Sequence, residues 1–202
     1  AHLSEQFGLT VKEIEADGFF IDKRCPIPMG SDSATGTLLS IGKLLELLAN
    51  AIEDLSPDLI IVVGDRHEIF AAAVAATVLH IPLAHVHGGE LTLGAIDDVF
   101  RHSITKMAHL HFTATPEYRT RVIQMGENPK DVSMVGAPGL ESLGLLDYLP
   151  RPDVEKQTGL NFGEKNLLVA YHPETRSPGH NLKHLRIVLN AMDSFPDTQL
   201  IQ

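Results

Sequence analysis

The 202-residue chain has little cysteine, little positive charge and no long apolar segment. Its one cysteine, Cys25, excludes an internal disulfide and fits a reducing compartment, which favours a cytoplasmic location. No apolar run is long enough to span a bilayer, so we expect no membrane partner. Because 26 acidic residues outnumber 16 Lys and Arg, the formal net charge is -10. Such a chain lacks the basic field that binding to nucleic acid requires.

The fingerprints of common nucleotide-binding folds are also missing from the sequence. No G-x-G-x-x-G motif follows a predicted strand, and no Walker lysine motif is present. NAD and nucleoside triphosphates are therefore not indicated, and we expect no cofactor. Histidine, in contrast, is plentiful, with 11 residues. Some of these would be surface or core residues, and others are candidate acid/base groups because imidazole titrates near neutrality.

Short apolar runs alternate with helical patterns through most of the chain. The run 59–63 is apolar without alternation, which predicts a strand buried on both faces. Strands followed by helices of this length predict an α/β fold with a parallel sheet. The predicted strands are 59–63, 81–87, 109–114 and 132–135, and the predicted helices are 37–55, 71–79, 97–108 and 116–125.

The amino-acid composition changes after residue 147. Prolines, glycines and charges crowd residues 147–165, which indicates a linker, and a new strand (166–171) and helix (181–194) follow. We therefore predict most of one domain in residues 1–147, and a linker with the start of a second domain in 148–202. Since the chain lacks an initiating Met and its last residues resemble the start of a strand, we expect a segment of a longer, two-domain protein.

Ionisable residues gather where two of the predicted strands end. In open parallel sheets, ligands bind just beyond the carboxyl ends of the strands. Gly88 and Gly89 allow a backbone to approach a ligand closely or to adopt positive φ, although most glycine pairs only form turns. The ionisable residues at these two strand ends are Asp65, Arg66, His67, Glu68, His85, His87 and Glu90. The sequence therefore predicts an active-site rim at this edge of the sheet.

Several of these candidates also have a structural interpretation. Asp65 can cap the helix that follows it as readily as it can act in catalysis, and Arg66 can bind phosphate or simply lie at the surface. Asp97 can start a helix by its favourable position at the helix dipole. Arg101, one turn later, can pair with Asp97 or contact a phosphate.

The histidines near strand ends also allow both a structural and a functional interpretation. His85 and His87 are two residues apart on a predicted strand, so their side chains are expected to face the same way. With Glu90 they could suggest a metal site, but the further spaced His or Cys ligands are missing, so we predict no metal. His109 and His111 are expected to be structural. His172 occupies the end of a predicted strand, where active-site residues collect.

Taken together, the motifs GDRHE, HVHGGE, AIDDVFRHSITKMAHLHF and YHPET resemble the UDP-N-acetylglucosamine 2-epimerase family, and in particular its hydrolysing branch, which serves sialic-acid and related nonulosonic-acid synthesis. The resemblance extends over nearly the whole chain, including HLSEQFGLTVKEIEADGF and VGAPGLE. It implies a fold of the glycosyltransferase-B type, in which two Rossmann-like domains enclose the nucleotide sugar. It also implies a dimer or a tetramer.

The resemblance further implies the chemistry. Loss of the proton from the sugar C2 is coupled to departure of UDP from C1, and in the hydrolysing branch water then adds to the glycal-like intermediate. Asp65 matches the catalytic Asp of the family's GD motif, and Asp97 matches the acidic residue of its IDD motif. Arg101 matches an arginine that contacts the substrate phosphates, and His172 matches a histidine of the second domain that closes over the substrate.

His87 departs from the family pattern. Many relatives carry a Glu at this place in H-[IV]-E-G-G-E, and that Glu is a leading acid/base candidate. Imidazole can still transfer a proton, or Glu90 can take over the role. The change is also compatible with a substrate other than UDP-N-acetylglucosamine, such as UDP-N,N'-diacetylbacillosamine. Other readings are a non-hydrolysing 2-epimerase, a glycosyltransferase, or a nucleotide-sugar-binding fragment without catalysis.

The resulting site prediction has two parts. The substrate-binding candidates are Arg66, Gly88, Gly89 and Arg101. The catalytic candidates are Asp65, His87, Glu90, Asp97 and His172.

Overall fold

The computed structural model describes residues 2–5, 8–27, 33–173 and 178–201, which form two compact units. The first unit comprises Ala1–Thr92 and Asp97–Ala137, and the second comprises Leu93–Ile96 and Pro138–Gln202. The main division therefore precedes the segment that the sequence marks as a linker. The assignment of residues 1–147 and 148–202 to two domains stays a prediction.

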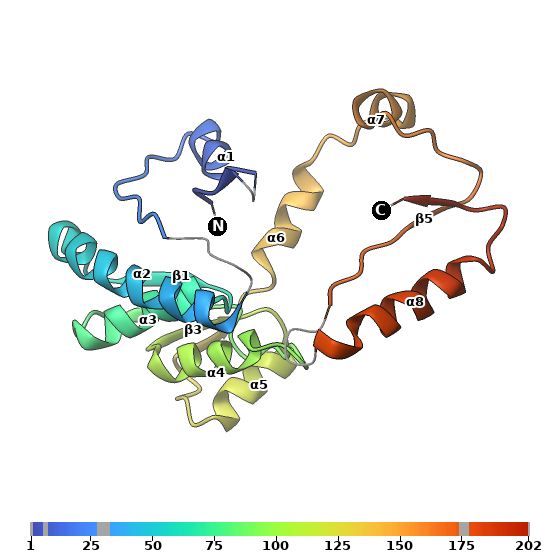
Figure 1. The fold of residues 1–202 in the computed structure, drawn as a ribbon. Coiled ribbons are helices and arrows are strands. Elements are labelled where there is room, and N and C mark those ends of the chain that lie inside the picture. Colours follow the sequence, from blue (N-terminus) through green and yellow to red (C-terminus); the bar gives the residue numbers. More distant parts are fainter. Residues whose placement is uncertain (1, 6–7, 28–32, 174–177, 202) are drawn as a thin grey trace. The chain divides into compact units, whose positions relative to one another are not determined.

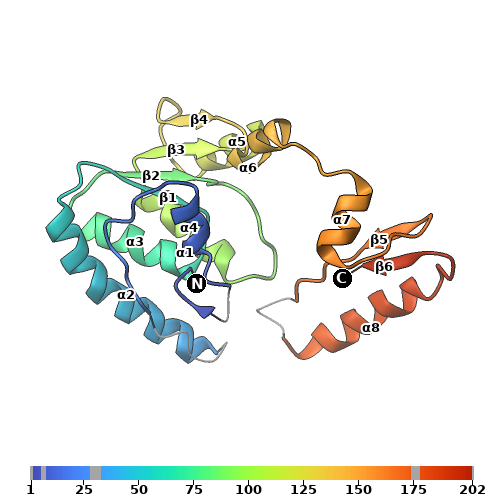
Figure 2. The ribbon, with the colours of Figure 1, turned by 90° about the horizontal axis from the view of Figure 1, so that it is seen from above.

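The first unit is built on a four-stranded parallel sheet with the order β1-β2-β3-β4 (Figures 1 and 2). Helices α3, α4 and α5 connect successive strands, and because such crossovers are nearly always right-handed, these helices lie on the same face of the sheet. The strands are β1 (Ile60–Val63), β2 (Leu83–Val86), β3 (Leu110–Thr113) and β4 (Val132–Met134). The helices are α1 (Val11–Ala16), α2 (Ala34–Leu55), α3 (His67–Val78), α4 (Asp97–Met107) and α5 (Pro116–Gln124).

Every strand and helix predicted between residues 37 and 135 is present, with ends that differ by a few residues. Local side-chain chemistry explains several of these ends. The Ser33 hydroxyl accepts a hydrogen bond from the Gly36 N–H at 3.0 Å. This cap lets α2 begin at Ala34, three residues before the predicted start at residue 37. Thr115 caps α5 in the same way, with Pro116 in its first turn.

The core of the first unit lies between the sheet and its helices. Val62, His85, His111 and Val132 stand in register across the four strands, and all four are buried. Small residues of α3, such as Ala73 and Ala76 at 0% exposure, allow this helix to pack closely on the sheet. Two histidines therefore lie inside an apolar core, where each polar atom requires a hydrogen-bond partner to offset its lost hydration.

The prediction that 59–63 is buried on both faces is wrong. In β1, Val62 is 4% exposed, but Ile61 is 62% and Val63 is 55% exposed. The reason is that β1 is an edge strand paired only with β2 within the described residues, and the helices that follow it cover one face.

The second unit contains a two-stranded parallel sheet whose strands are joined by a crossover through α8. The predicted strand and helix after residue 165 and the predicted strand at the chain end are confirmed. A helix, α7, lies where the sequence predicts a linker; it ends at Gly159, which adopts φ 71. The elements are α6 (Pro138–Glu141), η2 (Ser142–Leu145), α7 (Arg151–Thr158), β5 (Asn166–Leu168), η3 (Pro178–His180), α8 (Asn181–Met192) and β6 (Gln199–Ile201).

Candidate active site

Asp65 is brought to the edge of the sheet by the turn that ends β1. Gly64 adopts φ 85, a left-handed conformation that glycine adopts readily, and its N–H donates to the Val86 carbonyl at 3.0 Å. Arg66, the residue after Asp65, is the N-cap of α3, and its side chain makes no capping hydrogen bond. The Asp65 carboxylate instead accepts a hydrogen bond from Arg101 on α4. Of the two interpretations of Asp65, helix cap and site residue, the contact favours the second.

Arg101 is the centre of the site. Its side chain is 8% exposed, and its guanidinium lies between two carboxylates. Nη2 donates to Asp65 Oδ2, and Nη1 lies 3.6 Å from Glu90 Oε2. The described ion pairs of Arg101 therefore involve the two strand ends rather than Asp97, its neighbour on α4. Its Nε is buried and has no hydrogen-bond partner among the described residues.

His87 and Glu90 form a directly bonded pair. The His87 Nδ1 and Glu90 Oε1 atoms are 2.7 Å apart. A carboxylate can only accept, so Nδ1 carries the proton and Nε2 remains the basic nitrogen of the neutral ring. Because both side chains are about three-quarters buried, this hydrogen bond is partly shielded from water.

The expectation that His85 and His87 face the same way rested on a strand that continues to His87. In the structure β2 ends at Val86, and His87 adopts φ 67 in the left-handed region. The side-chain alternation of a strand does not extend through such a residue. His87 therefore turns to Glu90, whereas His85 contacts other partners.

Four predicted residues are thus joined in one continuous set of contacts, Asp65–Arg101–Glu90–His87, which we call the charged network. It contains one guanidinium, two carboxylates and one imidazole. Arg101 offsets the repulsion between the carboxylates and the cost of removing them from water. The arrangement can hold a carboxylate base, a carboxylate-supported imidazole and a fixed positive charge within one small region.

An open pocket lies beside this network. It is lined by Asp65, Arg66, His67, Thr92, Asp97 and Arg101. The structure therefore brings Asp97 and Arg66 to the same pocket as Asp65, although Arg66 is 55% exposed and pairs with Glu68 at 3.2 Å. His67 was placed on the predicted active-site rim but not among the catalytic or substrate-binding candidates, and Thr92 was not predicted. Both residues could have been found from their position in the sequence, since each lies within a few residues of a predicted site residue.

Gly88 and Gly89 are both buried, and packing gives a reason for each glycine. A Cβ on Gly88 would lie 3.1 Å from Thr105 Oγ1 and 3.2 Å from His85 Nδ1. A Cβ on Gly89, which has φ 81, would lie 2.4 Å from the Tyr118 carbonyl oxygen. Side chains at these positions would push the loop away from its neighbours. The substrate-binding role assigned to the two glycines stays a prediction.

The remaining strand histidines make structural contacts. His111 is 1% exposed and its Nε2 lies 3.4 Å from Glu127 Oε2, and His109 Nδ1 accepts from the Leu83 N–H at 3.3 Å. Burial lowers the pKa of His111, and Glu127 opposes this shift. His172 is exposed and belongs to the second unit, after the end of β5. Its catalytic role stays a prediction.

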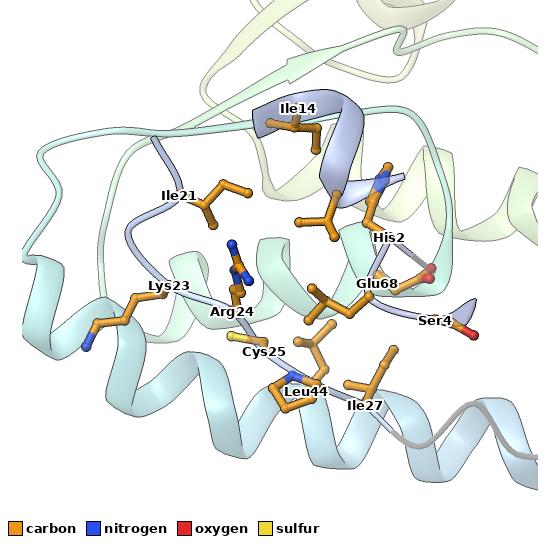
Figure 3. Close-up of a pocket in the computed structure, with 13 residues that line it drawn as sticks. His2, Ser4, Ile14, Ile21, Lys23, Arg24, Cys25, Ile27, Leu44 and Glu68 are labelled. Carbon is orange, nitrogen blue, oxygen red and sulfur yellow. The ribbon is translucent and has the colours of Figure 1, made fainter. Parts of the chain in front are cut away.

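A second pocket lies between the amino-terminal segment and α2 (Figure 3). Its lining is mostly apolar, with Ile14, Ile21 and Leu44 among its residues, and it also includes Cys25. Burial raises the pKa of the Cys25 thiol, which disfavours the reactive thiolate. Glu68, one of the predicted rim residues, belongs to its lining, but no catalytic or substrate-binding candidate is among the described residues that line it.

In the described part of the chain, no group of three His, Cys, Asp or Glu side chains is arranged to hold a metal ion. Among the helices of the same residues, none combines the length and the apolar character that a membrane crossing requires.

A parallel sheet with an ionisable pocket at its carboxyl edge defines a Rossmann-like α/β protein, a class in which ligands bind beyond that edge. Comparison with known families makes the assignment specific. The family model described as UDP-N-acetylglucosamine 2-epimerase matches residues 1–202. The chain belongs to this family.

Curated relatives include enzymes named as hydrolysing. The chain is 39% identical over 201 residues to the GDP/UDP-N,N'-diacetylbacillosamine 2-epimerase (hydrolyzing) of Campylobacter jejuni, covering 100% of the chain and 52% of the relative. It is 38% identical to the polysialic acid biosynthesis protein P7 of Escherichia coli, covering 98% and 50%. It is 37% identical to the UDP-N,N'-diacetylbacillosamine 2-epimerase (hydrolyzing) of Legionella pneumophila, covering 85% and 45%. The chain thus spans about half the length of these relatives.

Solved structures confirm the glycosyltransferase-B-type fold. The Staphylococcus aureus MnaA–UDP co-structure superposes with a TM-score of 0.77 at 18% identity, covering 98% of this chain and 52% of that one. The UDP-GlcNAc 2-epimerase of Neisseria meningitidis bound to UDP-GlcNAc gives a TM-score of 0.69 at 19% identity, covering 86% and 49%. At these identities the likeness concerns the fold alone.

Proposed function

We propose that the full-length protein is a hydrolysing 2-epimerase of a UDP-activated 2-acetamido sugar. It converts UDP-N-acetylglucosamine, or a related sugar such as UDP-N,N'-diacetylbacillosamine, to UDP and the free 2-epimer for nonulosonic-acid synthesis. Family membership and the names of the curated relatives support the reaction class. The observation that carries the proposal is the charged network of Asp65, Arg101, Glu90 and His87 beside an open pocket.

The reaction needs a base and a group that stabilises charge. A base removes the C2 proton while the C1–O bond to UDP breaks, and the electron pair of the C2–H bond forms the C1–C2 double bond of a glycal. Water then adds its oxygen to C1, and a proton returns to C2 from the opposite face. Asp65 is the proposed base or acid at C2. Arg101 holds this carboxylate in place, and its fixed positive charge at the pocket offsets the negative charge that develops as UDP departs.

His87 and Glu90 are proposed to act as one acid/base pair rather than as alternatives. Glu90 accepts from His87 Nδ1 at 2.7 Å, which orients the ring. His87 Nε2 is then the nitrogen that receives or returns a proton. A carboxylate-supported imidazole in this position can replace the Glu that many relatives carry there.

The other assignments complete the proposal. Asp97 is proposed to act in catalysis from the pocket wall, and Arg66, Gly88 and Gly89 to contact the substrate. His172 of the second unit is also assigned to the reaction. A dimeric or tetrameric assembly and a cytoplasmic location belong to the same proposal.

The test is to incubate the full-length protein separately with UDP-N-acetylglucosamine and with UDP-N,N'-diacetylbacillosamine and to separate the products. Release of UDP together with the free 2-epimer of either sugar is the expected result, and the faster of the two identifies the substrate. A product in which the epimerised sugar is still linked to UDP would assign the protein to the non-hydrolysing branch. Transfer of an unaltered sugar to an acceptor, or UDP binding without turnover, would contradict epimerisation.

A further inference from the structure

His85 lies behind the charged network and is wholly buried, at 0% exposure. Its Nε2 is 2.9 Å from the Gly64 carbonyl oxygen, and its Nδ1 is 3.2 Å from the Thr105 hydroxyl oxygen. A carbonyl can only accept, so Nε2 carries the proton and donates to Gly64. Nδ1 of the neutral ring then accepts from the Thr105 hydroxyl. We call His85 and Thr105 the buried pair.

The two partners of His85 belong to the two elements that carry the centre of the site. Gly64 directly precedes Asp65, and Thr105 lies one helical turn after Arg101 on α4. One imidazole therefore ties the turn that carries Asp65 to the helix that carries Arg101. Thr105 is itself 0% exposed, so this connection is shielded from water.

The Gly64 peptide requires a hydrogen bond of this kind to fix its orientation. Glycine at φ 85 has access to many backbone conformations, and the orientation of its carbonyl sets the direction in which the chain enters Asp65. The hydrogen bond from His85 selects one orientation. Gly88 closes the other side of the pair, since a Cβ there would meet both Thr105 Oγ1 and His85 Nδ1.

We propose that His85 is a positioning residue for the reaction, which fixes the Asp65 carboxylate against Arg101 through the Gly64 carbonyl without touching the substrate. This inference rests on the proposed function for its kinetic consequence, and on the contacts above for its geometry. In this role the ring is neutral, with Nε2–H donating to the Gly64 carbonyl and Nδ1 accepting from the Thr105 hydroxyl. Burial lowers the pKa of His85 to about 4, which keeps the ring neutral at physiological pH.

The test compares two isosteric substitutions in the full-length protein. The amide nitrogen of Gln reaches the place of Nε2, so His85→Gln keeps a donor for Gly64. The amide of Asn reaches only the place of Nδ1, so His85→Asn loses that donor. We expect His85→Asn to lower kcat by roughly 100-fold, the cost of a small displacement of a catalytic group, with KM changed by less than about threefold. His85→Gln, which keeps the donor to Gly64 but loses the acceptor for Thr105, is expected to lower kcat only about tenfold.

His111→Asn is the matched control, because His111 stands in register with His85, is equally buried and pairs with Glu127 away from the site. It is expected to lower Tm but to leave kcat within about threefold. Thr105→Val, which removes only the hydroxyl, supplies a second variant where His85→Asn fails to fold, and it is expected to lower kcat about tenfold. The proposal is overturned if kcat is unchanged in the folded His85→Asn or Thr105→Val variant. It is also overturned if kcat falls equally in His85→Asn and His85→Gln, or if it falls as much in His111→Asn as in His85→Asn.

The wild-type assay separates the two proposals. If the wild type releases UDP from neither sugar, the proposed function fails, and crystal structures of the variants decide the positioning role. The Asp65 carboxylate is then expected to leave hydrogen-bond reach of Arg101 in His85→Asn and to remain there in His85→Gln. An unmoved Asp65 in His85→Asn overturns the positioning role on its own.

Discussion

His85 and His87 are two residues apart, yet they lie in different surroundings. His85 lies within β2, is wholly buried, and contacts Gly64 and Thr105. His87 follows the end of the strand, adopts φ 67, keeps a quarter of its side chain exposed and bonds to Glu90. The change of backbone conformation at His87, one residue past the strand, therefore separates the histidine to which we assign a positioning role from the histidine to which we assign proton transfer.

The comparison also separates two kinds of polar contact. Two members of the charged network, Asp65 and Arg101, line an open pocket, and His87 and Glu90 are joined to them through the Arg101–Glu90 contact. The buried pair contains neutral groups whose hydrogen bonds are satisfied within the protein. Changes in the first are expected to affect the reaction, and changes in the second to affect stability and, through Asp65, the reaction rate.

The largest expected effect comes from Asp65→Asn, which breaks the charged network but leaves the buried pair intact. The amide keeps the size of the carboxylate but cannot act as a base. We expect kcat to fall about 10²- to 10⁴-fold, measured as UDP release by the full-length protein, with Tm within a few degrees of the wild type. Wild-type turnover in this variant would remove Asp65 from the mechanism.

The next effect concerns the buried pair and appears as a dependence of stability on pH. The pKa of His85 is about 4 in the folded protein and 6.5 in its unfolded reference, so the unfolded chain binds the proton more tightly. Stability is therefore fully present above pH 6.5 and is lost as the pH falls from 6.5 towards 4. Between pH 7.5 and 4.5 we expect His85 to account for about 2 to 3 kcal/mol of the loss in unfolding free energy.

Urea unfolding of the wild type and of His85→Gln at these two pH values measures this contribution. Gln does not titrate, so the variant should lose less stability on acidification than the wild type does. Parallel losses in the two proteins would show that His85 is not the group responsible.

A smaller effect is expected at His87, where two substitutions sharpen the comparison. His87→Ala should lower kcat about tenfold, because Glu90 stays held by Arg101 and can replace part of the lost function. His87→Glu should retain more activity than His87→Ala, since it restores a proton-accepting group. Equal activity of both variants and the wild type, measured as kcat for UDP release, would mean that His87 has no part in proton transfer.

The smallest effect is expected from Gly88→Ala, which places a methyl group against the buried pair and is expected to lower stability. The added Cβ would lie 3.1 Å from Thr105 Oγ1 and 3.2 Å from His85 Nδ1, so both neighbours must shift slightly. We expect a loss of about 1 kcal/mol in unfolding free energy. Gly89→Ala is the steric control and should cost more, because its Cβ would lie 2.4 Å from backbone at a left-handed φ. A Gly88→Ala protein as stable as the wild type would show that the buried pair tolerates displacement.

The sequence predicted the parts of the fold that depend on local pattern. Apolar runs and helical patterns located the strands and helices from α2 to β4 but not α1, and the position of strand ends placed Asp65 and Glu90 at one edge of the sheet. It did not predict the exposure of Ile61 and Val63, because that depends on β1 being an edge strand.

The predicted site was incomplete for a related reason. Arg101 has Asp97 as its neighbour in sequence, but its described ion pairs are with Asp65 and Glu90 from other elements. The left-handed conformation of His87 was not predicted, because the apolar pattern extends the strand to this residue and glycine adopts such conformations most readily. The link from His85 to Gly64 joins residues 21 apart in sequence and is visible only in the folded protein.

The most direct test of the proposed reaction is to run it in D₂O. Full-length protein is incubated with UDP-N,N'-diacetylbacillosamine, and with UDP-N-acetylglucosamine in parallel, and the sugar product is analysed by NMR and mass spectrometry. If a base at the charged network removes the C2 proton and solvent supplies its replacement, the product is the free 2-epimer with one deuterium at C2. A free sugar that retains hydrogen at C2, or that keeps its original configuration there, would contradict the mechanism.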